Sequence, residues 1–359
     1  MIQNITIIGG GSTGFAATAW LTAKGFKVTL CDNESFLPIL DEIEKNNGIL
    51  LRGKAGRRGL FKPEKVTCDP AEAIPGAELI IICVPAKRHE EIAEFIAPYV
   101  TAGMDILISP GNLGSFVFRD VFERRRVSGV RLSELEGNIC PCRITGPAEA
   151  TVGLPIRKKR IACLQGGLTG KVIARLDGVF EFEANRNVFE CALLSDNFVL
   201  HIGTCLLSAA RIEQLGKEFI MFQHALTPAS IDLAAAVQIE RKALLARLGL
   251  KERDSASEFF EELIDHKNHP EYSVFRTLDG PDSIQHRYID EDSRACAALA
   301  LSLAERFGIK MPVLGAIVTI AGTLNGLDYL EIGRTLRNLG FADDLSGDEI
   351  IAEISKGDA

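Results

Sequence analysis

Two groups of residues in this sequence have types and spacing suited to proton transfer and carboxylate binding. Asn197 and His201 are four residues apart in an apolar stretch, so a helix would project both side chains from one face. Histidine exchanges protons near neutral pH and suits general acid–base catalysis. The second group is Arg287, whose planar guanidinium matches carboxylate or pyrophosphate, followed by the acidic run Asp290–Asp292. The simpler interpretations, a core histidine and acids favoured by a helix start, stay open on these grounds.

A third group surrounds the glycines that follow the apolar run Ile5–Ile8. Three of these glycines have the spacing G-x-G-x-x-G, which allows a sharp turn, close approach to a pyrophosphate and tight helix packing, in that order. Asp32 follows the next apolar run, about 20 residues further on, where an acid bonds the ribose hydroxyls. The pattern predicts a dinucleotide site, and the residues expected to contact the cofactor are Gly9, Gly10, Gly11, Ser12, Thr13, Gly14 and Asp32.

The acid at position 32 also bears on which dinucleotide is used. A carboxylate there repels the 2′-phosphate of NADP, so the sequence favours NAD. NADP stays open as an alternative, because four basic residues follow and could reach a phosphate. These are Arg52, Lys54, Arg57 and Arg58, for which a solvated basic loop is the simpler interpretation.

These residues need a scaffold, and the first half of the sequence alternates apolar strands with helices. Residues 78–84 form a near-continuous apolar run, as expected for a parallel strand covered on both faces. Ligands bind beyond the carboxyl ends of such strands, so we expect Val84, Pro85 and Ala86 to line the cofactor groove. A plain loop after a core strand is the alternative for each of them.

The alternation ends with two further strands, Ala150–Leu154 and Arg160–Leu164, which are predicted to form an antiparallel pair. Beyond them only helical periodicity is found. The sequence therefore predicts an α/β Rossmann domain at residues 1–185 and an all-helical domain at residues 186–359. We expect the active site in the cleft between the two domains.

Two helices stand out in the predicted second domain. Asn187–Leu215 is predicted as one long amphipathic helix that carries the candidate histidine. Ser230–Leu248 is predicted as another, with alanine and leucine on one face. Its opposite, solvated face would carry Glu240, Arg241 and Lys242.

Composition excludes several classes of protein. The 359 residues carry a formal net charge of −8, which argues against a general nucleic-acid surface. A strand starts within the opening residues, so no signal peptide is expected, and no apolar run approaches the ~20 residues of a membrane helix. The nine cysteines are scattered, as in a reducing cytoplasm, and Cys140-Pro141-Cys142 has the wrong spacing for zinc. We expect a cytoplasmic protein without a metal, and a homodimer is the assembly hypothesis.

Taken together, these motifs resemble the opine dehydrogenases, the octopine/nopaline dehydrogenase group. Residues 197–201 fit the family's Asn-x-x-x-His helix, which holds its catalytic histidine, and residues 287–292 fit its Arg-Tyr-x-x-Glu-Asp signature. Gly333-Arg334-Thr335-Leu336, followed by Leu339-Gly340, fits its C-terminal helix pattern. Cys142-Arg143 falls where the family has a Cys-Arg pair near the substrate. The resemblance spans essentially the full length.

The resemblance implies a reaction and roles for these residues. An amino acid and a 2-oxo acid such as pyruvate would condense to an imine, which NADH or NADPH reduces; the reverse reaction oxidises the secondary amine. The helical domain would be of the 6-phosphogluconate dehydrogenase C-terminal type. His201 would be the general acid/base and Asp292 its orienting carboxylate. The remaining implied site residues are Asn197 and Arg287 for catalysis and Cys142, Arg143 and Arg287 for substrate binding.

The sequence departs from the family pattern in places, and two other functions stay open. Ile202 stands where the family commonly has proline, and Glu134 and Glu136 compete for one acidic position. Another NAD(P)-dependent reductase of the same architecture, acting on a 2-oxo or 3-hydroxy acid, would expect a catalytic lysine, and residues 187–215 contain none. A non-catalytic NAD-binding redox sensor has no reason to place the histidine, arginine and aspartate around one cleft.

Overall fold

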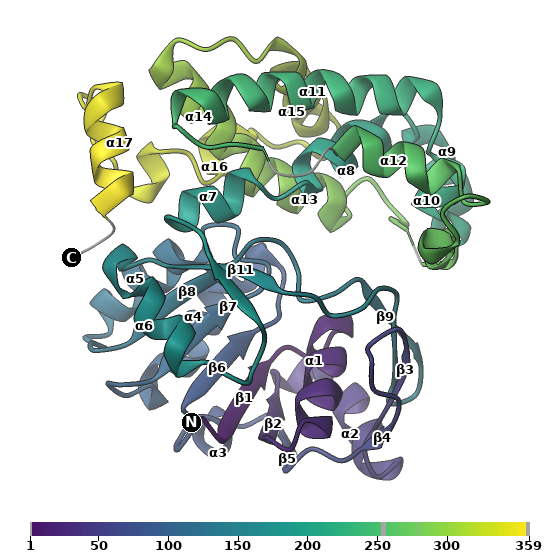
Figure 1. Cartoon of the computed structure of the whole chain (residues 1–359), viewed down its shortest axis with the longest axis vertical. Coiled ribbons are helices and arrows are strands. Elements are labelled where there is room, and N and C mark those ends of the chain that lie inside the picture. Colours follow the sequence, from purple (N-terminus) through teal and green to yellow (C-terminus); the bar gives the residue numbers. More distant parts are fainter. Residues whose placement is uncertain (1, 253–255, 279, 357–359) are drawn as a thin grey trace. The chain divides into compact units, whose positions relative to one another are not determined.

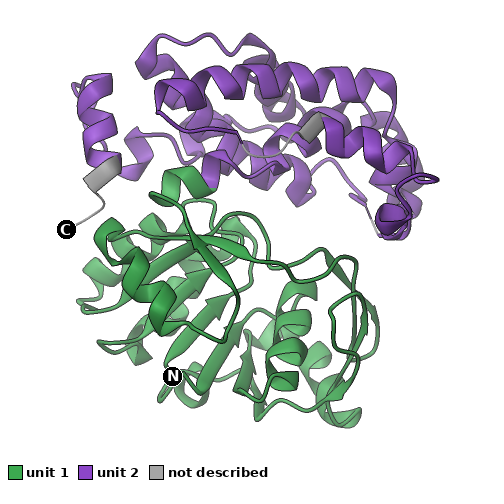
Figure 2. Cartoon of the chain, viewed as in Figure 1, with its two compact units in different colours: residues 1–191, 356–359 green, residues 192–355 purple. Residues whose placement is uncertain are grey.

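The computed structural model describes residues 2–252, 256–278 and 280–356. They form two compact units, which divide between residues 191 and 192 (Figure 2). The first unit alternates strands and helices, and the second is all-helical over its described residues, which confirms the predicted fold class. The domain boundary between residues 185 and 186 stays a prediction.

The larger sheet of the first unit contains β1 (Asn4–Ile8), β2 (Lys27–Cys31), β5 (Lys65–Thr67), β6 (Leu79–Ile82), β7 (Asp105–Ile108), β8 (Arg131–Leu135), β11 (Lys159–Cys163) and β12 (Phe182–Ala184). Its order is β12-β11-β8-β7-β6-β1-β2-β5, and all neighbours are parallel except β8 and β11 (Figure 1). The chain leaves β1 to form β2 on one side and later returns to form β6 on the other. The carboxyl ends of β1 and β6 are therefore the switch point at which doubly wound sheets bind ligands.

A second sheet contains β3 (Ile49–Gly53), β4 (Gly59–Phe61), β9 (Cys142–Gly146) and β10 (Glu149–Val152), in the order β4-β3-β10-β9. The predicted pairing of the strands near residues 150 and 160 is wrong, because β10 pairs antiparallel with β9 while β11 belongs to the larger sheet. The cause is the turn at Pro147 and Ala148, where φ of Ala148 is 48°. This turn reverses the chain after β9 and gives β10 a hairpin partner.

The helices of the first unit are α1 (Ser12–Ala23), α2 (Leu37–Lys45), α3 (Pro70–Ala73), α4 (His89–Ile96), α5 (Gly114–Arg124) and α6 (Thr169–Arg175), and α7 (Val188–Leu193) leads into the second unit. Helix α1 contacts strands of both sheets. Its side chains Phe15, Ala16 and Leu21 are buried, and the indole of Trp20 donates a hydrogen bond to the carbonyl of Ala55 at 3.1 Å. Because α1 packs against both sheets, the glycine turn before it is held in place.

The second unit contains α8 (Asn197–Leu206), α9 (Ala209–Leu215), α10 (Met221–His224), α11 (Pro228–Arg247), α12 (Ala256–Ile264), α13 (Arg287–Asp292), α14 (Ala298–Phe307), α15 (Pro312–Asn325), α16 (Tyr329–Ile332) and α17 (Gly347–Lys356). The prediction of one helix over Asn187–Leu215 is wrong, because the chain breaks into α7, α8 and α9. The bend between Val188–Leu206 and the helix that follows it is 76°. The candidate histidine therefore sits on its own short helix, α8.

Arg241 of α11 explains the break before α8. Its side chain is buried, and its guanidinium donates hydrogen bonds to Asp196 Oδ1 at 2.9 Å and to the carbonyl of Ser195 at 3.4 Å. It also binds Glu252 at 2.6 Å. A cation from a distant helix thus provides hydrogen-bond donors for the non-helical residues between α7 and α8. Local periodicity cannot reveal such a long-range interaction.

Glu240 of α11 is buried for a related reason. Its carboxylate accepts hydrogen bonds from the backbone N–H groups of Val313 at 2.8 Å and Leu314 at 2.9 Å, at the start of α15. A carboxylate there caps the helix and complements its dipole. The predicted solvated face of α11 is therefore wrong for Glu240 and Arg241, whereas Lys242 is exposed.

No single described helix has both the length and the apolar character needed to cross a membrane. Two bent pairs, Val188–Leu206 with Ala209–Glu218 and Pro312–Asn325 with Tyr329–Leu339, meet the length and composition test together.

Candidate active site

The glycine turn between β1 and α1 has the shape of a dinucleotide cradle. Gly9 has φ of 127°, and a Cβ built on it would lie 2.4 Å from the carbonyl oxygen of Cys83. A Cβ on Gly14 would lie 1.8 Å from the carbonyl oxygen of Gly9, so α1 can approach the turn only without a side chain there. A Cβ on Gly11 would meet nothing within 4 Å, so the backbone faces open space. Gly9 and Gly14 are thus needed for close packing of the turn, whereas Gly11 leaves room for a phosphate.

The start of α1 completes this cradle. The N-cap residue is Gly11, and no side chain caps the first amides of the helix. Ser12 Oγ accepts a hydrogen bond from the N–H of Ile144 at 3.1 Å, and Thr13 Oγ1 accepts one from Asn138 Nδ2 at 3.0 Å. The side chains of Ser12 and Thr13 are thus held by the 138–144 segment, while the helix dipole and its N–H groups suit a pyrophosphate. These residues fit the dinucleotide that the fold implies.

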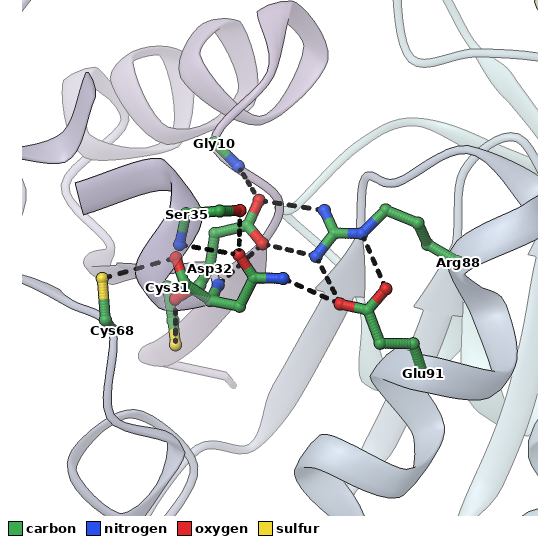
Figure 3. A network of polar contacts seen from close by, with 8 residues as sticks. Gly10, Cys31, Asp32, Ser35, Cys68, Arg88 and Glu91 are labelled. Carbon is green, nitrogen blue, oxygen red and sulfur yellow. Dashed lines mark hydrogen bonds and ion pairs between the residues drawn. The ribbon is translucent and has the colours of Figure 1, made fainter. Parts of the chain in front are cut away.

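Asp32, at the end of β2, does not present an open carboxylate. Its side chain is 0% exposed and accepts hydrogen bonds from the N–H groups of Gly10 at 2.7 Å and Asn33 at 2.8 Å. Two nitrogens of Arg88 bind its two oxygens at 2.8 and 3.3 Å (Figure 3). Burial by itself lowers the pKa of Arg88, but hydrogen bonds with Glu91 and Asp32 outweigh this effect and raise it. The sequence pattern located the acid but missed its arginine partner.

The segment after β6 lies against the glycine turn. Val84 Cγ1 would be 3.2 Å from a Cβ on Gly9, and Val84 and Ala86 are buried. Pro85 is half-buried and precedes a short turn of 3₁₀ helix that ends at Arg88. The loop that was predicted to line the cofactor groove therefore also carries Arg88, which binds Asp32. Arg88 could have been identified from the sequence, because it is a basic residue shortly after the carboxyl end of β6.

The Cys-Arg pair lies on β9 of the first unit. The thiol of Cys142 is buried and donates a weak hydrogen bond to Thr13 Oγ1 at 3.9 Å, while Arg143 Nη1 donates to the carbonyl of Cys142 at 2.9 Å. A hydrogen bond with Cys142 and burial hold the pKa of Cys140 well above its usual value, so this thiol stays protonated. The structure places the pair beside the glycine turn, and its substrate role stays a prediction.

The two competing acids of the 134–136 segment have different structural partners. Glu134 is fully buried and accepts hydrogen bonds from the N–H groups of Leu113 at 2.9 Å and Ser115 at 2.8 Å, at the start of α5. Glu136 forms an ion pair with Arg160 at 3.1 Å. Glu134 therefore positions the loop between β7 and α5.

His201 and Asp292 form a buried pair in the second unit. Nδ1 of His201, on α8, lies 2.8 Å from Oδ2 of Asp292, at the end of α13, with side-chain exposures of 10% and 7%. An ionised carboxylate only accepts hydrogen bonds, so it fixes the proton on Nδ1 and leaves Nε2 to exchange protons with another molecule. The ring of Tyr288 stacks on the imidazole with centroids 4.0 Å apart. This aromatic contact was not predicted, although Tyr288 lies inside the signature.

Arg287 and Asn197 lie next to this pair. The guanidinium carbon of Arg287 lies 5.0 Å from the ring centroid of Tyr288, so the tyrosine ring contacts both the arginine and the histidine. Asn197 is the first residue of α8, one turn before His201, and is half-buried. The structure thus places His201 in direct contact with Asp292, connects Arg287 to His201 through the ring of Tyr288, and places Asn197 on the same short helix as His201.

The backbone around Asp292 is unusual. The π-helix Ser293–Ala297 follows α13 directly, and such segments occur frequently at functional sites. Gly333 supports it, because a Cβ there would lie 2.7 Å from the carbonyl oxygen of Arg294, and the N–H of Arg334 donates to the same oxygen at 2.7 Å. Gly333 and Arg334 of the C-terminal motif therefore contact the segment that directly follows Asp292.

Asp290, two residues before the end of α13, has structural partners. Its Oδ1 accepts hydrogen bonds from Arg294 at 2.9 Å and from the hydroxyl of Tyr329 at 3.2 Å. Among the residues that the structure describes, no cluster of three or more His, Cys, Asp or Glu side chains could hold a metal ion.

Two protein families match separate parts of the chain. Residues 184–325 match the family described as NAD/NADP octopine/nopaline dehydrogenase, alpha-helical domain. Residues 5–110 match the ketopantoate reductase PanE/ApbA family. The first match covers α8 and α13, and the second covers the glycine turn, Asp32 and Arg88.

Similar proteins span nearly the whole chain. An opine dehydrogenase of Arthrobacter sp. (strain 1C) is 28% identical over 352 residues, covering 95% of this chain and 97% of the relative. Octopine dehydrogenase with NADH and L-arginine has a TM-score of 0.70 at 19% identity, covering 99% of this chain and 98% of that chain. Yersinopine dehydrogenase with NADP⁺ has a TM-score of 0.62 at 15% identity, with the same coverage. The two structural likenesses show the fold.

Proposed function

From the premise that this chain belongs to the opine dehydrogenase family and is an NAD(P)-dependent oxidoreductase of that type, we propose that it joins an amino acid to a 2-oxo acid. The amine and the carbonyl would condense to an imine, whose reduction gives a secondary amine with two carboxylates. The observation that carries this proposal is the 2.8 Å contact between His201 and Asp292. Octopine dehydrogenase in complex with NADH and L-arginine supports the substrate class.

The chain's own residues would move the protons of this reaction. Formation of an imine releases water, which requires a proton on the departing hydroxyl, and Nε2 of His201 would donate it. Asp292 would hold the imidazole ring in place and stabilise its protonated form through Nδ1. Arg287, with its planar fork, would bind a substrate carboxylate or the pyrophosphate. The glycine turn and α1 would hold the NAD(P)H, which supplies the hydride.

A two-substrate panel tests this proposal. NADH and NADPH oxidation is followed with amino acids alone, with 2-oxo acids such as pyruvate alone, and with both together. Turnover only with both partners is expected. Turnover with the oxo acid alone would point to a ketopantoate-type reductase instead, and no turnover with any pair would leave a nucleotide-binding sensor.

Replacing the histidine tests its role within the same assay. His201→Ala should lower turnover by roughly 10²–10⁴-fold, the usual contribution of a general acid–base group, while NADH still binds. NADH affinity is measured separately by fluorescence titration. If turnover of the His201→Ala variant stays within a few-fold of the wild type, His201 is not the general acid–base group.

A further inference from the structure

The carboxylate of Asp32 has its acceptor positions filled by the protein itself. A carboxylate offers about four lone-pair positions. Oδ1 accepts from the N–H of Asn33 and from Arg88 Nη2, both at 2.8 Å. Oδ2 accepts from the N–H of Gly10 at 2.7 Å and from Arg88 Nη1 at 3.3 Å. The bonds to ribose hydroxyls that an acid at this position ordinarily makes are already taken by Arg88 and the backbone.

Arg88 covers this acid and is the more accessible of the two. Its side chain is 15% exposed, against 0% for Asp32. Its guanidinium also lies 5.2 Å from the ring centroid of Phe36. It binds Glu91 at 2.9 Å, a contact that Figure 3 shows. Contacts with Asp32, Glu91 and Phe36 together fix the plane of the guanidinium. Within the Asp32–Arg88 pair, the side chain that reaches solvent is therefore the cation.

This arrangement changes the electrostatics of cofactor choice. The argument for NAD rests on repulsion between an exposed carboxylate and a 2′-phosphate, but the Asp32 charge is neutralised by a bidentate ion pair. A guanidinium fork is also the side chain best matched to a phosphate. We propose that Arg88, rather than Asp32, determines cofactor choice, and that the protein accepts a 2′-phosphate and so uses NADP(H) as well as NAD(H).

Glu91 acts against this attraction. It accepts hydrogen bonds from Arg88 Nε and Nη2 and from Asn33 Nδ2, and its side chain is half-exposed. Its negative charge lies on the solvent side of the ion pair and would weaken binding of a second anion. Neutralising Glu91 should therefore strengthen binding of a 2′-phosphate without removing Arg88.

The test uses two cofactor fragments, 5′-AMP and 2′,5′-ADP, which differ by one phosphate on the 2′ oxygen. Their Kd values are measured by calorimetry with the full-length protein. The wild type should bind 2′,5′-ADP at least as tightly as 5′-AMP. Arg88→Ala should weaken 2′,5′-ADP at least tenfold more than 5′-AMP, and Glu91→Gln should tighten 2′,5′-ADP a few-fold and leave 5′-AMP unchanged. Arg58→Ala is the matched control, because Arg58 is exposed and donates to the carbonyl of Gly53 at 2.7 Å.

Three results would overturn the proposal. These are a wild type that prefers 5′-AMP tenfold, an Arg88→Ala variant that weakens both fragments equally, and an Arg58→Ala variant that alone removes 2′,5′-ADP binding. If Arg88→Ala does not fold, the Glu91→Gln ratio decides, and an unchanged ratio counts against the proposal. The inference rests on the proposed function only in assuming that the cofactor is a nicotinamide dinucleotide. Fragment binding needs no substrate, so failure of opine synthesis would leave this test intact.

Discussion

The contact of Asp292 with His201 gives the proposed mechanism its most direct residue-level prediction. Asp292→Asn keeps the shape of the side chain, but its amide can donate to Nδ1 and so favour the wrong tautomer of the ring. We expect kcat to fall by roughly 10²–10⁴-fold while the Kd of NADH stays unchanged. Initial rates and a fluorescence titration measure the two quantities.

Asp290 provides the matched control on the same helix. Its carboxylate binds Arg294 and Tyr329 rather than the histidine. Asp290→Asn should therefore lower thermal stability but keep kcat within a few-fold. Equal losses of kcat in both variants would mean that Asp292 acts only by holding α13 together.

Sequence reasoning reached these residues because each belongs to a short motif with fixed spacing. Asn197 and His201 share one helix, and Arg287 and Asp292 share another, so covalent distance alone groups them. Motif spacing did not connect Arg88 with Asp32, because the two lie 56 residues apart along the chain and meet through the order of the strands. Tyr288 was inside the signature, but its stacking on His201 depends on how α8 and α13 pack.

At the scale of one element, the glycine turn offers a paired test of cofactor binding. Gly11→Ala should leave the free energy of unfolding within about 0.5 kcal/mol of wild type, because its Cβ meets nothing within 4 Å. It should nevertheless weaken NADH binding, since the methyl group occupies the space through which a phosphate approaches the backbone. Calorimetric titration and urea denaturation measure the two effects.

Gly14→Ala should behave in the opposite way. Its Cβ would lie 1.8 Å from the carbonyl oxygen of Gly9, so α1 must shift and the first unit loses stability. A Gly11→Ala protein that binds NADH as well as wild type would show that this turn does not hold the cofactor.

The break between α7 and α8 is a second element-level feature. Removing the charge of Arg241 leaves Asp196 and Glu252 without their cation, and losing one partner of a buried ion pair is strongly destabilising. Arg241→Met should lower the free energy of unfolding by roughly 2–4 kcal/mol. Lys242→Ala, at an exposed position next to it, should change it by less than about 0.5 kcal/mol. Similar values for the two variants in urea denaturation would show that the break does not depend on this pair.

Element prediction succeeded where local pattern suffices and failed where a remote group decides. The glycine pattern predicts a helix directly after the turn, and α1 spans Ser12–Ala23, because the signal for this helix lies in the adjacent residues. The single helix over Asn187–Leu215 failed, since its periodicity continues through Ser195 and Asp196 and only buried Arg241 explains the break. Glu240 and Arg241 were assigned to solvent because charged residues usually lie there.

At the scale of the whole molecule, the proposed reaction assigns separate tasks to the α/β unit and the helical unit. The first would hold the dinucleotide at its glycine turn, and the second would exchange protons through His201 and Asp292. The alternation of strands and helices followed by helices alone was enough to predict this architecture. The identity of the amino acid and the 2-oxo acid depends on side chains that no local motif identifies.

The central claim, reductive joining of two substrates, is tested most directly by product analysis. The protein is incubated with NADH, pyruvate and a ¹⁵N-labelled amino acid, chosen as the most active partner in the substrate panel, and the product is identified by mass spectrometry. The account predicts one secondary amine per NADH consumed, containing both the label and the pyruvate carbons. Consumption of NADH with formation of lactate, and with the labelled amino acid recovered unchanged, would contradict it.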